Sequence, residues 1–216
     1  MYYPYGELYR QDASRIMTVN GDASFSVEPD TVSIQLEVVT KSERLNQAQQ
    51  ENTHIMNQVI EALVQEGISR ENIKTSAYNI NPSYDYVDGK QVFRGYQVTN
   101  IITLKMKNID QAGRMIDLAV KNGVNRVSNI QFTIENQQQY YQRALNNALK
   151  NAFAKAQTIA ETLNVNFDSI PLKIIEETIE TPQTFQTFAA MEDSMSTPIE
   201  PGQIIIRAKV EAQFRY

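Results

Sequence analysis

The chain has 216 residues, and its 20 lysines and arginines against 25 aspartates and glutamates give a formal net charge of -5 at pH 7. This length is enough for one large domain or two small ones. No cluster of basic residues supports nucleic-acid binding, and the lack of cysteine excludes thiol catalysis, disulfides and cysteine-bound metal. No apolar run approaches the roughly 18 residues that a transmembrane helix needs.

The N-terminal end is predicted to be a flexible tail that leads into a strand. Residues 1–13 are polar and rich in tyrosine, and we predict that they form a tail ahead of a single domain over 14–216. The tail contains neither the basic region nor the apolar segment of a secretory signal, which by itself indicates a cytoplasmic protein. A strand is predicted over 15–27, with a β-bulge at Gly21.

After a turn at Glu28-Pro29-Asp30, the pattern predicts a second strand and then a helix. Apolar and polar residues alternate from Val32 to Val38, which fixes the register because a slip of one residue would expose the whole apolar row. Thr40-Lys-Ser-Glu43 has the form of a capping box, which predicts the start of a helix, and Gly67 predicts its end. The buried stripe of this helix is predicted to contain Leu45, Ala48, Ile55, Met56, Val59 and Leu63.

A hairpin arm is predicted between a third strand over 73–82 and a fourth strand over 95–107. Asp88-Gly89 indicates a two-residue turn, because both central residues of such a turn need a positive φ. The turn places Tyr84, Tyr86 and Phe93 on one face of the arm. These aromatic residues either pack onto their own domain or dock on a neighbouring subunit, and the sequence leaves both interpretations open.

The pattern next predicts a second helix over 109–121, which Asn122-Gly123 ends. A fifth strand is predicted over 127–135. Residues 30–135 read β-α-β-β-α-β, which is the order of a ferredoxin-like core with an antiparallel sheet. Right-handed crossovers place both helices on one face of this sheet. The inward-facing residues of these later elements are predicted to be Tyr96, Val98, Ile102, Leu104, Met106, Ala112, Met115, Ile116, Ala119, Ile130, Phe132 and Ile134.

Residues 136–216 are predicted to add a long third helix and two strands to this α+β core. The helix covers 136–163, and its ridge of small side chains lets another backbone approach closely, either the chain's own sheet or the helix of a second subunit. Strands are predicted over 172–179 and 204–215. The 180–202 loop between them is of a length that is usually functional or disordered. The ridge consists of Ala144, Ala148, Ala152, Ala156 and Ala160, and the loop contains Phe185, Phe188, Met191 and Met195.

Candidates for catalysis or metal binding each have a simpler interpretation. The only histidine, His54, falls outside the buried stripe of the first helix, which favours a solvated residue without an orienting partner. Glu176 and Glu177 are neighbours on a strand and face opposite ways. Glu192-Asp193 falls in the loop, where a solvated pair is favoured over a metal site. Asp85-Tyr-Val-Asp-Gly89 resembles part of a calcium loop but lacks its remaining ligands.

The sequence contains none of the common catalytic or cofactor-binding motifs. Glycine-rich dinucleotide and phosphate loops are absent, as is the nucleophile elbow of α/β-hydrolases. We therefore predict no catalytic residues, no metal and no cofactor. The methionines could scavenge oxidants as sulfoxides, but four of them fall on strand or helix patterns and are predicted to be core residues: Met17, Met56, Met106 and Met115.

Several short segments occur in a characteristic order and spacing along the chain. They include Gly21, Glu28-Pro29-Asp30, Gly67-Ile68, Ile73-Lys74-Thr75, Asn81-Pro82-Ser83-Tyr84, Gly95-Tyr96-Gln-Val-Thr-Asn100, Asn122-Gly123 and Thr197-Pro-Ile-Glu-Pro-Gly202. In these segments the chain resembles the SIMPL-domain family of bacterial periplasmic immunogenic and oxidative-stress-defence proteins. The resemblance implies an α+β subunit that forms large closed homo-oligomers in the periplasm or cell envelope, and it implies no catalytic residues. The chain departs from the family at Leu163-Asn-Val-Asn-Phe167, which lacks the glycines expected after the third helix.

The sequence thus favours a non-enzymatic, self-assembling protein linked to envelope or oxidative-stress defence. Its predicted oligomer contacts are Tyr84, Tyr86 and Phe93, and its predicted partners are further copies of itself. The alternative is a small-ligand or peptide-binding module, in which the 180–202 loop forms a lid over the sheet, since flexible methionine-rich segments suit adaptable binding. The sequence does not identify a small-molecule ligand. An unrecognised hydrolase or isomerase remains a third, less favoured hypothesis.

Overall fold

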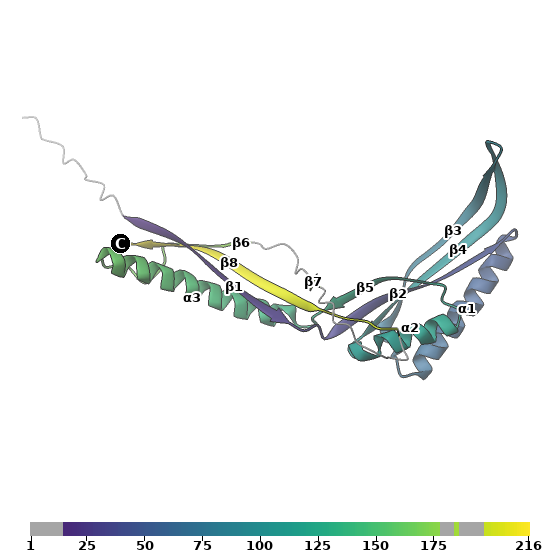
Figure 1. Ribbon diagram of the computed structural model, residues 1–216, viewed down its shortest axis with the longest axis horizontal. Coiled ribbons are helices and arrows are strands. Elements are labelled where there is room, and N and C mark those ends of the chain that lie inside the picture. Colours follow the sequence, from purple (N-terminus) through teal and green to yellow (C-terminus); the bar gives the residue numbers. More distant parts are fainter. Residues whose placement is uncertain (1–14, 178–183, 186–196) are drawn as a thin grey trace, which may run out of the picture. The chain divides into compact units, whose positions relative to one another are not determined.

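The computed structural model describes residues 15–177, 184–185 and 197–216 (Figure 1). The chain divides into two compact units. Of the described residues, we call 27–135, 184–185 and 197–204 the ferredoxin-like unit, and 15–26, 136–177 and 205–216 the helix-backed unit. The predicted tail over 1–13 lies outside the described residues.

The ferredoxin-like unit confirms the predicted β-α-β-β-α-β order. Its sheet has the strand order β3-β4-β2-β5, and all of its strand pairs are antiparallel. The strand that follows each helix is therefore separated from the strand before it by one intervening strand, as in a split β-α-β arrangement. The elements are β2 (Thr31–Ser42), α1 (Leu45–Gln65), η1 (Arg70–Asn72), β3 (Ile73–Val87), β4 (Lys90–Met106), η2 (Ile109–Gln111), α2 (Ala112–Lys121) and β5 (Arg126–Thr133).

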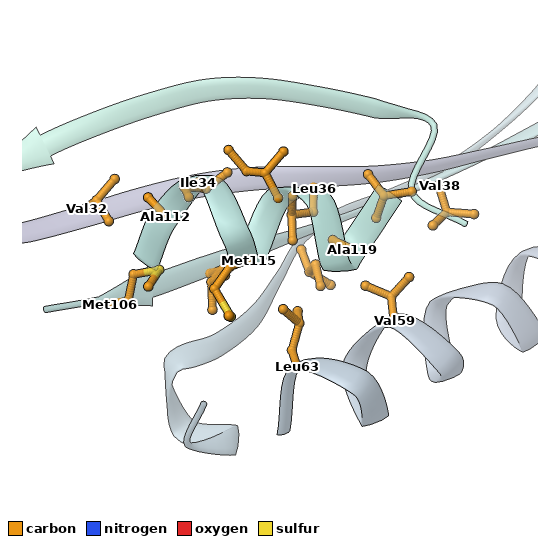
Figure 2. Packing of buried hydrophobic residues seen from close by; sticks show 14 of the residues in the cluster. Val32, Ile34, Leu36, Val38, Val59, Leu63, Met106, Ala112, Met115 and Ala119 are labelled. Carbon is orange, nitrogen blue, oxygen red and sulfur yellow. The ribbon is translucent and has the colours of Figure 1, made fainter. Parts of the chain in front are cut away.

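The core of this unit lies between the sheet and the two helices. Figure 2 shows the even-numbered side chains of β2 pointing toward α1 and α2, where Leu63 and Met115 meet them. Burying a side chain of this size contributes about 1.5–3 kcal/mol relative to leaving it in water. The cluster is formed by Val32, Ile34, Leu36, Val38, Met56, Val59, Leu63, Ile102, Leu104, Met106, Ala112, Met115, Ile116, Ala119 and Val124.

Two local predictions in this unit are wrong. Thr40 does not begin a helix, because β2 pairs with β4 as far as Ser42, and the Thr40 hydroxyl donates to the carbonyl oxygen of Ala48 at 2.7 Å. The N-cap of α1 is Arg44, without a side-chain cap. Ile130 is exposed, because the register of β5 shifts beside Asn129, whose φ is +45°.

In the helix-backed unit, one long helix covers a three-stranded path of sheet. The strands β1 (Ile16–Val27), β8 (Gln203–Arg215) and β6 (Lys173–Glu177) lie in the order β1-β8-β6, and β6 pairs antiparallel with β8. The helix α3 (Gln137–Leu163) begins at Asn136, whose side-chain oxygen accepts from the amide of Gln139 at 3.3 Å. It ends at Asn164, which takes the left-handed conformation in place of the expected glycine.

The alanine ridge packs on the chain's own sheet, and Gly21 is the point of closest approach. All five alanines of the ridge are buried. A Cβ atom at Gly21 would meet the carbonyl oxygen of Ala148 and lie 2.7 Å from the amide nitrogen of Ala152. The predicted bulge is wrong: β1 runs without interruption through Gly21, and the glycine is required by contact with α3.

The predicted 180–202 loop contains a short strand, which the sequence pattern did not indicate. The strand β7 (Thr184–Phe185) pairs antiparallel with Gln203 and Ile204 of β8. Phe188, Met191, Met195 and the Glu192-Asp193 pair lie outside the described residues. The first described residue after that stretch, Thr197, is bound to α2: its amide and its hydroxyl both donate to the carboxylate of Asp117.

Candidate functional site: the aromatic arm

Residues 83–95 form a two-stranded arm that leaves the body of its sheet. Pairing between β2 and β4 ends at Ser42 and Tyr96, so beyond this point only β3 and β4 pair with each other, as the upturned hairpin of Figure 1 shows. The predicted turn is confirmed: Asp88 and Gly89 have φ values of +50° and +74°. We call residues 83–95 the aromatic arm.

The base of the aromatic arm is fixed by a bulge and by a close backbone contact. The register between β3 and β4 shifts after Ser83, so that Ser83 pairs with Gly95 and Tyr84 pairs with Phe93. Arg94 is the extra residue, and its side chain binds Asp85 at 2.7 Å. Gly95 has a φ of +110° and passes so close to the β2–α1 junction that a Cβ atom would lie 2.7 Å from the Cα of Glu43. Bulges increase the local twist and redirect a strand, which sets the direction of the arm.

The aromatic side chains of the arm divide into a packed group and a free tyrosine. The rings of Tyr84 and Phe93 meet edge to face, with centroids 5.6 Å apart, and Phe93 meets Tyr96 in the same way at 5.3 Å. This ladder supports the first interpretation, packing onto the chain's own domain, but leaves Tyr84 and Phe93 nearly half exposed. Tyr86 lies nearer the turn and is 77% exposed.

Apolar exposure continues along the arm and its neighbouring edge strand. Within the described residues, β3 pairs only with β4, so its other edge has no partner strand. Exposed edges and apolar patches are typical of surfaces that bind another chain. The exposed large side chains on these strands are Tyr78, Ile80, Tyr84, Tyr86, Val87, Val92 and Phe93.

The other chemical candidates of the sequence remain apart from one another. His54 is exposed on α1. Glu176 and Glu177 face opposite ways, as predicted: Tyr141 donates its hydroxyl hydrogen to Glu176, while Lys209 binds Glu177 at 2.7 Å. This hydrogen bond is the main cause of a raised pKa of the Tyr141 phenol. The described segments contain no group of three or more residues suited to holding a metal ion.

The burial of one carboxylate and of one side-chain amide was not predicted from the sequence. Glu37 is buried on the sheet face away from the helices, where the Ser128 hydroxyl donates to it at 2.6 Å and Arg126 lies 3.7 Å away. Asn52 is completely buried in α1, and its amide donates to the carbonyl oxygens of Val38 and Val98. Its position four residues after Ala48 could have placed it on the buried stripe. Glu37 joins β2 to β5, and Asn52 joins α1 to β2 and β4.

A groove in the helix-backed unit offers a candidate site for the alternative hypothesis, a ligand-binding module. A groove of about 480 Å³ lies between β1 and α3 in the helix-backed unit, lined by Val19, Asn20, Asn151, Ala154, Lys155, Thr158 and Ile159. Most of the proposed 180–202 lid falls outside the described residues. The four methionines predicted to be core residues are all buried.

These features define an α+β protein whose ferredoxin-like sheet carries an exposed aromatic arm and whose second unit is a sheet covered by one alanine-faced helix. None of the described helices is both long enough and apolar enough to cross a membrane. The chain belongs to the SIMPL family, described as a protein of unknown function (DUF541), whose profile matches residues 17–214.

Two bacterial relatives show how far the similarity extends along the chain. The chain is 26% identical over 210 residues to the 26 kDa periplasmic immunogenic protein of Brucella melitensis, which covers 92% of this chain and 83% of the relative. It is also 26% identical over 149 residues to the uncharacterized protein YggE of Escherichia coli K12, which covers 69% of this chain and 60% of that protein. The match to YggE therefore spans less than two thirds of its length.

Proposed function

We propose that this protein is non-enzymatic and works by assembling with copies of itself, with the aromatic arm as a contact surface. The observation that carries the proposal is the 77% exposure of Tyr86 on an arm that reaches past the last β2–β4 pair. Tyrosine is enriched among the residues that dominate binding energy at protein interfaces. The occupant of this surface is a second copy of the chain.

The physical reason is that the arm has little core of its own. An isolated two-stranded hairpin is at best marginally stable in water, and here only the Tyr84–Phe93–Tyr96 ladder supports it. A neighbouring subunit that covers Tyr86 and Val87 would remove apolar surface from water and protect the open edge of β3. The surface provides apolar and aromatic contact, and its ion pair, Arg94 with Asp85, is exposed to solvent.

The test is the native mass of the wild-type protein and of Tyr86→Ala, measured by light scattering across micromolar concentrations. We expect the wild type to be an oligomer and Tyr86→Ala to dissociate at concentrations roughly thirtyfold higher, which corresponds to about 2 kcal/mol for an interface tyrosine. Tyr140→Ala, on α3 of the other unit, is the matched control and should keep the wild-type mass. A monomeric wild type, or an unchanged mass for Tyr86→Ala with an intact circular dichroism spectrum, contradicts the proposal.

We place this activity in the bacterial envelope and link it to oxidative-stress defence. The compartment is supported by the name of the Brucella relatives, the 26 kDa periplasmic immunogenic protein. The link to stress rests on the family resemblance alone. Cell fractionation of the natural host tests the compartment, and a deletion strain that survives peroxide as well as its parent would refute the stress link.

A ligand-binding module is the second candidate, favoured by the groove between β1 and α3. Apolar side chains line part of this groove. Lys155 also lines it, and its ammonium donates to the carbonyl oxygen of Asn20 at 2.8 Å. Limited proteolysis separates the two candidates. A lid over a ligand becomes protected when a metabolite mixture is added, whereas an assembly arm becomes protected as protein concentration rises.

A further inference from the structure

The edge strand β6 exposes apolar side chains on both of its faces. In the described part of the chain, β6 pairs with β8 on one side and with no strand on the other. Ile174 is 50% exposed on the face that α3 covers, and Ile175 is 39% exposed on the opposite face. Natural edge strands usually carry charges, prolines or bulges that prevent another strand from adding to them. β6 carries charges at Lys173, Glu176 and Glu177, but its middle residues Ile174 and Ile175 are apolar and exposed.

The opposite edge of the same sheet is protected over its middle. On β1, the exposed positions Thr18, Asn20 and Asp22 are polar, whereas Ile16 at the start of the strand is 47% exposed. Lys155 covers the middle of this edge, because its ammonium binds the carbonyl oxygen of Asn20 at 2.8 Å and lies 3.3 Å from the carboxylate of Asp22. This arrangement hinders strand addition along the middle of β1.

On the face that carries Lys173, Ile175 and Glu177, the sequence of β6 is complementary to itself when two copies run antiparallel. The strand reads Lys-Ile-Ile-Glu-Glu over residues 173–177. In the register that overlaps all five residues, Ile175 lies opposite Ile175 of the second copy, and Lys173 lies opposite its Glu177 at both ends. On the other face, Ile174 lies opposite Glu176. Directly opposite residues of an antiparallel pair share a face and interact, and opposite charges there are favourable. A two-fold axis through Ile175 generates this self-complementary contact.

The charges around β6 are arranged to accept this contact. Glu177 is bound by Lys209 on its own sheet at 2.7 Å and remains partly exposed. Lys173 is exposed, and it forms no ion pair with the described residues. Glu176 is turned to the other face, where it accepts from Tyr141. A second copy would place its Glu177 beside the free Lys173 without displacing either existing contact.

We propose that β6 is a homophilic docking edge, where two copies of this chain pair their β6 strands antiparallel about a two-fold axis at Ile175. The contact continues the sheet β1-β8-β6 of one subunit into the sheet of its partner. It is separate from the aromatic arm, which belongs to the other unit, and it adds a second kind of subunit contact.

The first experiment uses disulfide formation, since the natural chain has no cysteine. Directly opposite residues have Cα atoms about 4.5–5.5 Å apart, which is within the range that a disulfide spans. We expect Ile175→Cys to form a covalent dimer under mild oxidation. Lys173→Cys is the matched control on the same face of the same strand, because its copies would lie about 13 Å apart, four residues along the strand. Equal cross-linking of both variants, or none for Ile175→Cys, overturns the proposal.

The second experiment reverses the charges. Lys173→Glu places like charges at both ends of the contact, and so does Glu177→Lys combined with Lys209→Glu, which keeps the internal ion pair with its sign reversed. We expect each variant alone to associate at least about tenfold more weakly than the wild type. A mixture of the two variants should form heterodimers at the same protein concentration at which the wild type associates. A mixture that associates no better than its components contradicts the proposed register.

Both experiments are carried out in the wild-type and Tyr86→Ala backgrounds. The β6 contact is expected to persist when the arm contact is lost. If Ile175→Cys still cross-links in the Tyr86→Ala background, the β6 contact is supported independently of the arm contact. If the charge variants keep the wild-type mass, the β6 contact is refuted and the arm contact is not.

Discussion

Substitution of Gly21 by alanine tests how closely α3 is packed on its sheet. The new Cβ atom would lie 2.7 Å from the amide nitrogen of Ala152 and closer still to the carbonyl oxygen of Ala148. Both atoms belong to the helix backbone, so no side chain can rotate away. The helix must move by more than 0.7 Å, because a movement of 0.7 Å brings only the Ala152 contact to the 3.4 Å of ordinary van der Waals contact.

The cost of this movement follows from the alanine ridge. Five buried alanines hold α3 on the sheet, and a gap of about 0.5–1 Å forfeits a quarter to a half of each dispersion contact. Overpacking of a well-packed core usually costs about 1–3 kcal/mol and sometimes more. We expect Gly21→Ala to lower the free energy of unfolding by about 3 kcal/mol, which is a large part of the roughly 5–15 kcal/mol of a typical domain.

The assay is urea unfolding followed by far-ultraviolet circular dichroism, to which the 27-residue helix α3 contributes strongly. Hydrogen exchange of α3 peptides assigns the loss to the helix-backed unit. Ser24→Ala is the control, because Ser24 is exposed on the same strand and surface substitutions usually change stability by less than about 0.5 kcal/mol. A Gly21→Ala protein within about 0.5 kcal/mol of the wild type refutes the close approach of α3.

Three further predictions concern the buried amide and the two carboxylates that bind hydroxyl groups. Asn52→Ala should lower the free energy of unfolding by about 1–3 kcal/mol, because it removes the donor to two buried carbonyls. Asn52→Asp should lower it more at pH 7 than at pH 5, because a buried carboxylate resists ionisation. Urea unfolding measures both effects. Hydrogen bonds from Thr197 lower the pKa of Asp117 below its ordinary 3.8. The contribution of this contact to stability is therefore complete above pH 3.8 and is lost as pH falls through the lowered pKa. In a carboxyl NMR titration, Asp117 of the wild type should have a lower midpoint than Asp117 of Thr197→Ala. The raised pKa of Tyr141, ordinarily 10.0, comes first from its hydrogen bond to Glu176, so this contribution is complete below pH 10.0 and lost as pH rises through the raised value; NMR titration of ring-labelled tyrosine should give a lower Tyr141 pKa in Glu176→Gln.

The elements that depend on local pattern were predictable from the sequence. Asp88-Gly89 admits few conformations other than a tight turn, and this turn sets the pairing of Tyr84 with Phe93. The alanines of α3 recur every four residues and must share one face of a helix. The alternation in β2 fixed its inward row, which the structure confirms.

The features that depend on distant contacts were not predictable in the same way. Thr40-Lys-Ser-Glu43 has a helix-capping pattern, but pairing of β2 with residues 96–98 of β4 extends the strand through it. Gly21 looks like a bulge until α3 is placed on it. At the candidate site, the sequence grouped three aromatic residues, whereas the bulge at Arg94 brings Tyr96 into the ladder and leaves Tyr86 alone.

The most direct test of self-association is the native mass of the purified chain in solution. Each subunit has a mass of 24.6 kDa. Native mass spectrometry and light scattering at micromolar concentration should both give a defined multiple of this value, which Tyr86→Ala and Lys173→Glu should each reduce. A single species of 24.6 kDa at every concentration would contradict the account, because neither the arm nor the β6 edge would then have a partner.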